Sequence, residues 1–212
     1  MKKITVLTFC FCLATIVCKS QYFVGGSINF DSQGGHTKSD DTTTKSATAF
    51  NYTLSPQIGK QLSEKVDLGF ALTFGQHYAN SNQTPETKWN SISFGFHPFV
   101  RYYAFGVNKF SLYGQLTGIM DYSKSQSKTD GESNDDETKT IILGVQVYPG
   151  ISYRLNEKID LMAGINLFRF GFYQTFTKTN GYTESETSFG FGANMDQIFT
   201  TGSITVGAIF RF

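Results

Sequence analysis

The sequence predicts an all-β fold, an eight-stranded antiparallel up-and-down transmembrane β-barrel. Three observations support this prediction. Apolar residues alternate with small or polar residues over runs of about ten positions, the length of a tilted strand that crosses a bilayer. Long polar segments and short turns follow these runs in strict alternation, as in a meander. One hairpin unit also occurs three times along the chain.

The repeated unit is a short turn between two alternating apolar runs. In each copy a proline comes first, Lys65, Lys109 or Lys158 closes the turn, and a strand follows. Residues two apart on a strand share a face, so Ile159 and Leu161 begin one continuous apolar surface in the third copy. A unit repeated at this spacing indicates one architecture built by repetition. The copies cover residues 56–74, 98–116 and 149–167.

The remaining strands and loops follow from the same alternation. The expected strands cover about residues 22–31, 46–60, 66–78, 91–102, 110–122, 140–153, 159–173 and a last strand that ends at Phe212. The expected polar loops cover residues 32–45, 79–90, 123–139 and 174–188. Residues 189–202 fit either the last strand or the fourth loop. This order places both termini at the end of the barrel that carries the short turns.

The composition of the two strand faces indicates which one meets lipid. One face is broad, aliphatic and aromatic, whereas the other is small and moderately polar, which suits a narrow interior. The small face carries Gly69, Ala71, Thr73, Ser91, Ser93, Gly95, Gln115, Thr117, Gly144, Gln146, Gly164 and Asn166. Aromatic residues collect near both strand ends, as in interfacial girdles: Tyr102, Tyr153, Phe210 and Phe212 at one end, Phe74, Tyr78, Tyr122 and Phe172 at the other. Strands in lipid cannot leave edges unpaired, so the sheet is expected to close.

The N-terminal segment, residues 1–20, is expected to be a cleaved secretory signal peptide, because two lysines precede a short apolar stretch and a small-x-small site. A lipoprotein signal at Cys18 is the alternative. The barrel domain would then be residues 21–212. All three cysteines lie in the signal, so thiol chemistry is not expected in the mature chain. Removing Lys2, Lys3 and Lys19 leaves 15 basic against 17 acidic residues, which gives no footprint for nucleic acid.

Five charged residues face the interior near the turn end by alternation: Asp67, Arg101, Arg154, Asp160 and Arg211. A charge inside a barrel must be paired or hydrated, because stranding it costs several kcal/mol. The favoured interpretation is a structural network that closes this end of the barrel. The alternative is a gate.

Residue patterns for catalysis or metal binding are sparse. His36 lies in the first polar loop near Ser32 and Asp40, yet no further element of a catalytic constellation accompanies it. His97 points inward with no second histidine or cysteine at ligand spacing. The acidic run 135–137 lacks a calcium-loop pattern. No enzyme activity, cofactor or metal is therefore expected.

The chain resembles the small eight-stranded outer-membrane barrels of Gram-negative bacteria, of the OmpX and OmpA-barrel type, and above all the outer membrane protein β-barrel domain group of Bacteroidetes. The hairpins 55–75 and 98–118 and the terminal Phe212 carry the resemblance. It implies insertion by the outer-membrane assembly machinery, which recognises the last strand, here with Phe210 and Phe212. It does not imply one activity, because the same barrel hosts adhesins, structural proteins and enzymes.

The predicted function is a non-enzymatic integral outer-membrane protein with a structural, envelope-stabilising or surface-interaction role. A small porin-like channel is the first alternative and a lipid A-modifying barrel enzyme the second. We expect a monomer with periplasmic termini and extracellular loops, surrounded by outer-membrane lipids and lipopolysaccharide. Arg169 falls on the lipid face by alternation, so it is a candidate contact for a lipopolysaccharide phosphate.

Overall fold

The computed structural model describes residues 21–39, 42–45, 47–81, 86–129, 132–165, 168–193 and 204–212. The expected signal peptide, residues 1–20, lies outside this part of the chain. Within it no helix is long and apolar enough to span a membrane. The strands are β1 (Tyr22–Gln33), β2 (His36–Ser39), β3 (Thr42–Lys45), β4 (Thr48–Ser63), β5 (Val66–Asn80), β6 (Thr87–Val107), β7 (Phe110–Thr129), β8 (Glu132–Arg154), β9 (Ile159–Ile165), β10 (Phe168–Thr179), β11 (Tyr182–Ala193) and β12 (Ile204–Arg211).

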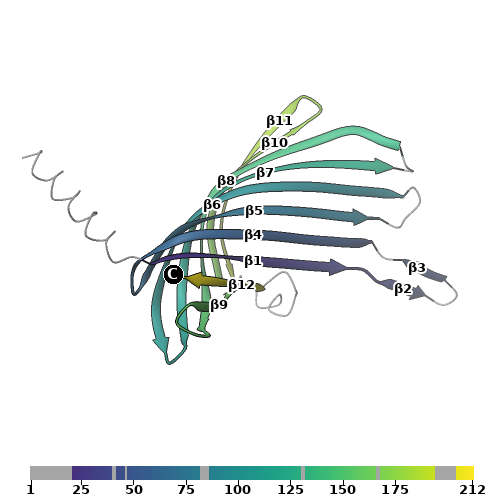
Figure 1. The fold of residues 1–212 in the computed structure, drawn as a ribbon. Coiled ribbons are helices and arrows are strands. Elements are labelled where there is room, and N and C mark those ends of the chain that lie inside the picture. Colours follow the sequence, from purple (N-terminus) through teal and green to yellow (C-terminus); the bar gives the residue numbers. More distant parts are fainter. Residues whose placement is uncertain are drawn as a thin grey trace, which may run out of the picture.

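A ring of eight antiparallel strands confirms the predicted barrel. The sheet runs β9–β12–β1–β4–β5–β6–β7–β8, and an additional pairing between β8 and β9 closes it. Strands that are consecutive in the sequence lie side by side over most of the ring, as in a meander. Figure 1 shows the long strands sweeping away from the turn end, with the C-terminus beside the start of β1.

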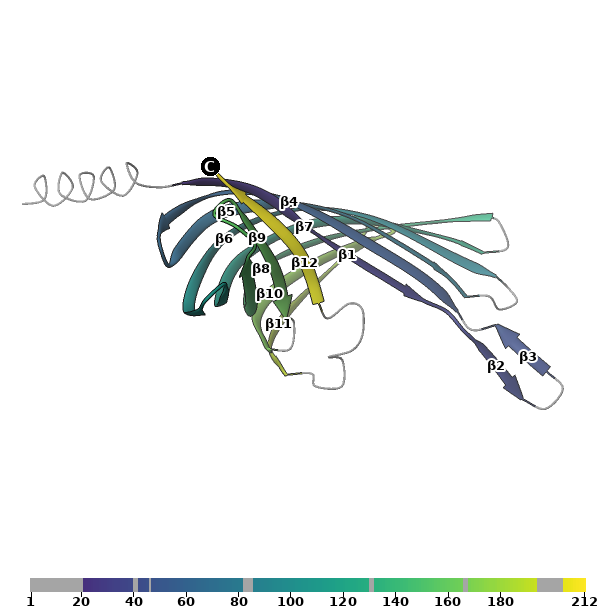
Figure 2. The same cartoon turned by 60° about the horizontal axis from the view of Figure 1, so that its bottom comes forward.

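The seventh and eighth strands of the barrel are each built from two segments. The lower part of β8, Gly150–Arg154, pairs with β9, and its upper part, Thr138–Val147, pairs with β10. In the same way β12 pairs with β9, and β11 pairs with β10. Of the ambiguous stretch 189–202, residues 189–193 belong to β11, and the rest lies outside the described residues. Figure 2 shows the β10–β11 hairpin below the ring.

The loops are shorter than the sequence predicted. The predicted loop bounds were therefore wrong. Most of residues 79–90, 123–139 and 174–188 lies in strands, and β2 and β3 form a hairpin within 32–45. Alternation disappears in these segments because water reaches both faces of a sheet beyond the membrane. The fourth loop is only the turn Asn180–Gly181, with φ of 49° and 85°, and Asn-Gly is a strong hairpin signal.

The two strand faces are separated as predicted. Outward residues of β7 and β8 such as Leu116 and Val145 are about half exposed, as expected of side chains that meet lipid. Inside, Phe23 and Ile209 are completely buried. Backbone hydrogen bonds join the chain ends, from Tyr22 N to Phe212 O at 3.1 Å and from Phe212 N to Tyr22 O at 3.0 Å. The terminal residue therefore takes part in closing the ring.

Candidate functional site: the interior charge cluster

The three repeated hairpins position the interior cluster through their turn lysines. The backbone carbonyl of Lys65 accepts a hydrogen bond from Tyr103 N at 2.8 Å. The carbonyl of Lys109 accepts one from Arg154 N at 2.8 Å, and that of Lys158 accepts one from Arg211 N at 2.7 Å. In each copy, the turn thus fixes a residue on the neighbouring hairpin or strand whose side chain belongs to the interior charge cluster (Arg154, Arg211) or contacts it (Tyr103). The sequence repeat becomes a repeated anchoring contact.

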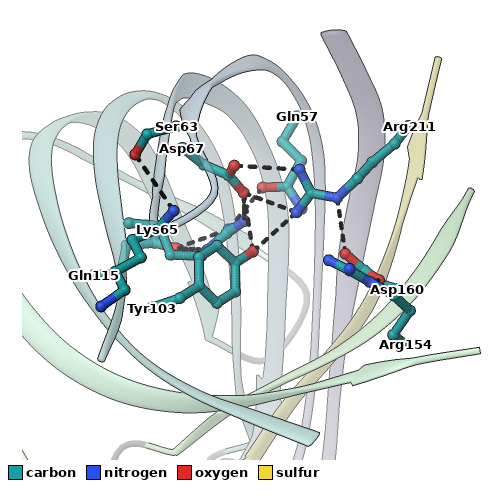
Figure 3. Close-up of polar contacts among 10 residues, drawn as sticks. Gln57, Ser63, Lys65, Asp67, Tyr103, Gln115, Arg154, Asp160 and Arg211 are labelled. Carbon is teal, nitrogen blue, oxygen red and sulfur yellow. Dashed lines mark hydrogen bonds and ion pairs between the residues drawn. The ribbon is translucent and has the colours of Figure 1, made fainter. Parts of the chain in front are cut away.

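Asp67 lies at the centre of the charge cluster, which comprises Asp67, Arg101, Arg154, Asp160 and Arg211. Figure 3 shows Asp67 facing Arg211 and Tyr103. Arg211 donates from Nη1 to Asp67 Oδ1 at 3.2 Å and from Nη2 to Asp67 Oδ2 at 3.0 Å, a bidentate pair. The Tyr103 hydroxyl donates to the same Oδ2 at 2.9 Å. On the other side Arg211 Nε donates to Asp160 Oδ2 at 2.8 Å, and Arg154 Nε donates to Asp160 Oδ1 at 3.2 Å. One arginine from the last strand therefore joins β5, β6 and β9.

Arg101 connects the cluster to the polar interior above it. Its Nη1 lies 3.5 Å from Asp67 Oδ2, within ion-pair range. Its Nε and Nη2 donate to Gln115 Oε1 at 3.0 and 2.8 Å, and Nη2 also reaches Gln57 Oε1 at 3.3 Å. Gln115 in turn donates to the Tyr148 hydroxyl at 2.6 Å. The guanidinium also lies over the rings of Phe99 and Tyr113, at 4.9 and 5.1 Å.

Four members of the cluster are buried, whereas Arg154 is largely exposed. The side chains of Asp67 and Asp160 are 0% and 2% exposed, and those of Arg101 and Arg211 are 3% and 4% exposed. Two buried carboxylates thus balance two buried guanidinium groups. Arg154 is 57% exposed at the end of its strand, so solvent screens its pair with Asp160.

The cluster lies between two cavities of the barrel. A cavity of about 270 Å³ extends above it, with Arg101, Tyr113 and Gln115 among its lining residues. A second cavity of about 820 Å³ occupies the turn end, and Tyr103 and Arg211 line it. The two cavities share no lining residue. The contacts through Asp67 therefore form a polar partition across the interior.

Several members of this network were not assigned to it from the sequence. From the sequence, Gln115 was placed only on the small inward face, and no contact was assigned to Tyr103 or Gln57. Their inward parity was the available signal, but alternation alone does not say which inward residues meet across the axis. A second inward pair, His97 Nε2 and Asp121 Oδ1 at 2.8 Å, also required the structure. No cluster of three metal-ligating side chains occurs among the described residues.

Other candidate residues lie elsewhere. Phe210 is an outward residue of β12 and Phe212 directly follows that strand at the turn end; both are exposed. Arg169 lies in β10 with its backbone opposite Gly192, but its side chain is outside the described part of the structure, as is that of His36.

Comparison with known proteins places this architecture in a family. Residues 5–212 match the family described as "Outer membrane protein beta-barrel domain". The chain belongs to this family. The family assignment makes it an integral outer-membrane β-barrel protein, as the resemblance implied. No curated protein sequence matches the chain.

Solved structures of outer-membrane proteins are similar to this barrel at low sequence identity. OprG from Pseudomonas aeruginosa is 13% identical, with 91% of this chain and 95% of that one covered and a TM-score of 0.49. Neisserial surface protein A is 14% identical, with coverage of 91% and 97% and a TM-score of 0.42. Ail, the attachment invasion locus protein of Yersinia pestis, is 13% identical, with coverage of 91% and 98% and a TM-score of 0.39.

The cluster predicts unequal effects of two substitutions. Asp67→Asn leaves the guanidinium groups of Arg211 and Arg101 buried without their shared anion, so the free energy of unfolding should fall by about 3–5 kcal/mol. Arg154→Gln removes a largely exposed partner and should cost less than about 1 kcal/mol. Urea unfolding of the folded protein in lipid vesicles measures both. Equal losses would show that Asp67 is not the central contact.

The contacts of Phe212 allow the role of its ring to be separated from the role of its backbone hydrogen bonds. Phe212→Ala keeps both backbone hydrogen bonds to Tyr22, whereas deletion of Phe212 removes them as well. If the assembly machinery recognises the ring, both changes should reduce folded barrel in the outer membrane, and replacing Phe210 together with Phe212 should reduce it further. Heat-modifiable gel migration of outer-membrane fractions measures folded protein. A normal level for Phe212→Ala would assign the effect to backbone closure alone.

Proposed function

We propose that this protein is a non-enzymatic barrel, closed along its axis, that stabilises the outer membrane and presents its long hairpins outside the cell for surface interactions. The observation that carries this proposal is the polar partition centred on Asp67. A transport pathway would have to break buried ion pairs at that level, because the same side chains fill the cross-section of the barrel.

The size of the barrel supports axial closure. An interior formed by eight strands is only about wide enough for side chains to fill it. Here large side chains occupy it, and Phe23, Phe99, Tyr113 and Met162 form a buried apolar cluster near the charges. A stable aqueous path for solutes is therefore not part of the proposed function.

The long strands support a role beyond the membrane. β6, β7 and β8 contain 21, 20 and 23 residues, whereas about 9–11 residues cross a bilayer. Polar pairs hold their upper parts together, including Ser125 Oγ to Ser91 Oγ at 2.9 Å and a contact of 3.0 Å between Thr138 Oγ1 and Thr179 Oγ1. A rigid, hydrogen-bonded sheet of this length is suited to display a binding surface, in a monomer whose termini lie in the periplasm.

Axial closure predicts the absence of conductance. The purified protein in a planar bilayer should give no stable conductance steps at neutral pH, because the ion pairs of Asp67 fill the cross-section. The matched comparison is Asp67→Asn, provided that it folds. Reproducible steps from the unsubstituted protein that change when Arg101 is replaced would favour the porin-like alternative and overturn the proposal.

The proposed orientation predicts surface labelling at the β7–β8 hairpin. An epitope inserted between Asp130 and Gly131 should be tolerated and should be labelled on intact cells, because β7 and β8 extend far beyond the expected membrane span. An epitope in the turn between β6 and β7, after Asn108, serves as the control and should be labelled only after permeabilisation. The reverse pattern would invert the orientation.

A further inference from the structure

Three adjacent strands carry a lysine on their outward face where the apolar surface ends. Lys124 is the next outward residue of β7 after Tyr122, and Lys139 precedes Ile141, the first apolar outward residue of that run in β8. Lys178 follows Phe176 on β10. Tyr122, Ile141 and Phe176 are themselves neighbours in register. The lysines thus border the lipid-facing surface on the loop side.

Strand register places these three side chains directly beside one another. Lys124 is the partner of Lys139 in the β7–β8 pairing, and Lys139 is the partner of Lys178 in the β8–β10 pairing. Cβ atoms of directly opposite residues lie only about 4.5–5.5 Å apart, and like charges in such positions destabilise a sheet. A row of three lysines is therefore costly unless an anion compensates it. We call Lys124, Lys139 and Lys178 the lysine row.

Among the described residues, one carboxylate compensates the row. Glu137 Oε2 lies 2.6 Å from Lys124 Nζ, and its Oε1 lies 2.8 Å from Lys139 Nζ. These contacts lower the pKa of Glu137 to about 2, chiefly through hydrogen bonds from Lys124 and Lys139, and the hydrogen bond to Glu137 raises the pKa of Lys139. Among the described side chains, three lysines against one glutamate leave a net charge of +2 on this patch.

We propose that the lysine row binds the phosphorylated head group of a lipid in the loop-side leaflet, with the acyl chains of that lipid lying on the apolar outer face of β7, β8 and β10. Two observations select a lipid rather than a soluble anion. The positive patch borders the surface that the acyl chains cover, and the apolar residues below it are half exposed toward the bilayer. A phosphate at the row compensates the charge that Glu137 leaves over.

This inference rests on the proposed orientation, which places the row in the outer leaflet, where lipopolysaccharide carries phosphate groups. It differs from the candidate contact at Arg169 in using side chains on three strands. It is also independent of axial closure, because no interior residue takes part. A failure of the lipid test would leave the conductance result unchanged, and the reverse also holds.

Lipid selection tests the proposal directly. The protein is reconstituted in phosphatidylcholine vesicles that hold equal small fractions of phosphorylated lipid A and its dephosphorylated form, and mass spectrometry quantifies the lipids that remain with the extracted barrel. Each basic residue near an anionic surface contributes roughly a fivefold change in binding. The unsubstituted protein should therefore enrich the phosphorylated form by about tenfold or more.

Matched variants identify the site. Replacing Lys124, Lys139 and Lys178 together by glutamine should abolish the enrichment, whereas the same substitutions at Lys65, Lys109 and Lys158 remove equal charge at the turn end and should leave it intact. Glu137→Gln should increase the enrichment, an opposite change that general loss of folding cannot produce. Heat-modifiable migration verifies that each variant is folded.

Three outcomes would overturn the proposal. The first is an enrichment that survives in the lysine-row variant. The second is an equal loss in the turn-end variant, which would assign the effect to net charge. The third is equal retention of the phosphorylated and dephosphorylated lipids by a barrel that binds inorganic phosphate at the lysine row, which would show that the row binds the free anion rather than a lipid.

Discussion

The turn end of the barrel depends on the pairing of Asp67 with Arg211. Asp67 is completely buried and Arg211 nearly so, and their bidentate contact joins the third strand of the ring to the last. Neither charge is tolerable without the other in this environment, because desolvation of a lone ion costs several kcal/mol. Tyr103 and Arg101 contact the same carboxylate, and Arg211 of the last strand completes the partition by joining it to Asp160. Closure of the ring and closure of the interior are therefore linked.

This linkage explains why a repeated hairpin suits the barrel. The turn lysines anchor Tyr103, Arg154 and Arg211 through backbone carbonyls, so these contacts do not depend on the lysine side chains. Backbone anchoring also fixes the height at which each inward side chain starts. Long arginine side chains can then meet two aspartates near the axis without loss of strand register, and Gly59 and Gly69 provide room for the rings of Phe23 and Phe99 beside them.

The sequence predicted the barrel well because lipid imposes a strict rule on strands that cross it. Outward positions must be apolar there, so parity alone placed Asp67, Arg101, Asp160 and Arg211 inside. Alternation along a strand does not say which inward residues of different strands meet. The contacts of Tyr103 with Asp67 and of Gln57 with Arg101 therefore required the structure. Beyond the membrane the rule lapses, and residues 123–139 were mistaken for a loop although most of them pair in β7 and β8.

The lysine row on the outer face shows the same limit of sequence analysis, because alternation does not say which residues of neighbouring strands lie side by side. Lys124, Lys139 and Lys178 are far apart in the sequence and lie in segments whose composition suggests only solvation. Their meaning depends on register: a shift of one residue in either strand pairing would turn a lysine to the opposite face. The four buried interior charges, Asp67 and Asp160 against Arg101 and Arg211, balance one another, whereas within the described part of the chain the outer row keeps a net positive charge. Recognition by this barrel is therefore better sought on its outer surface than along its axis.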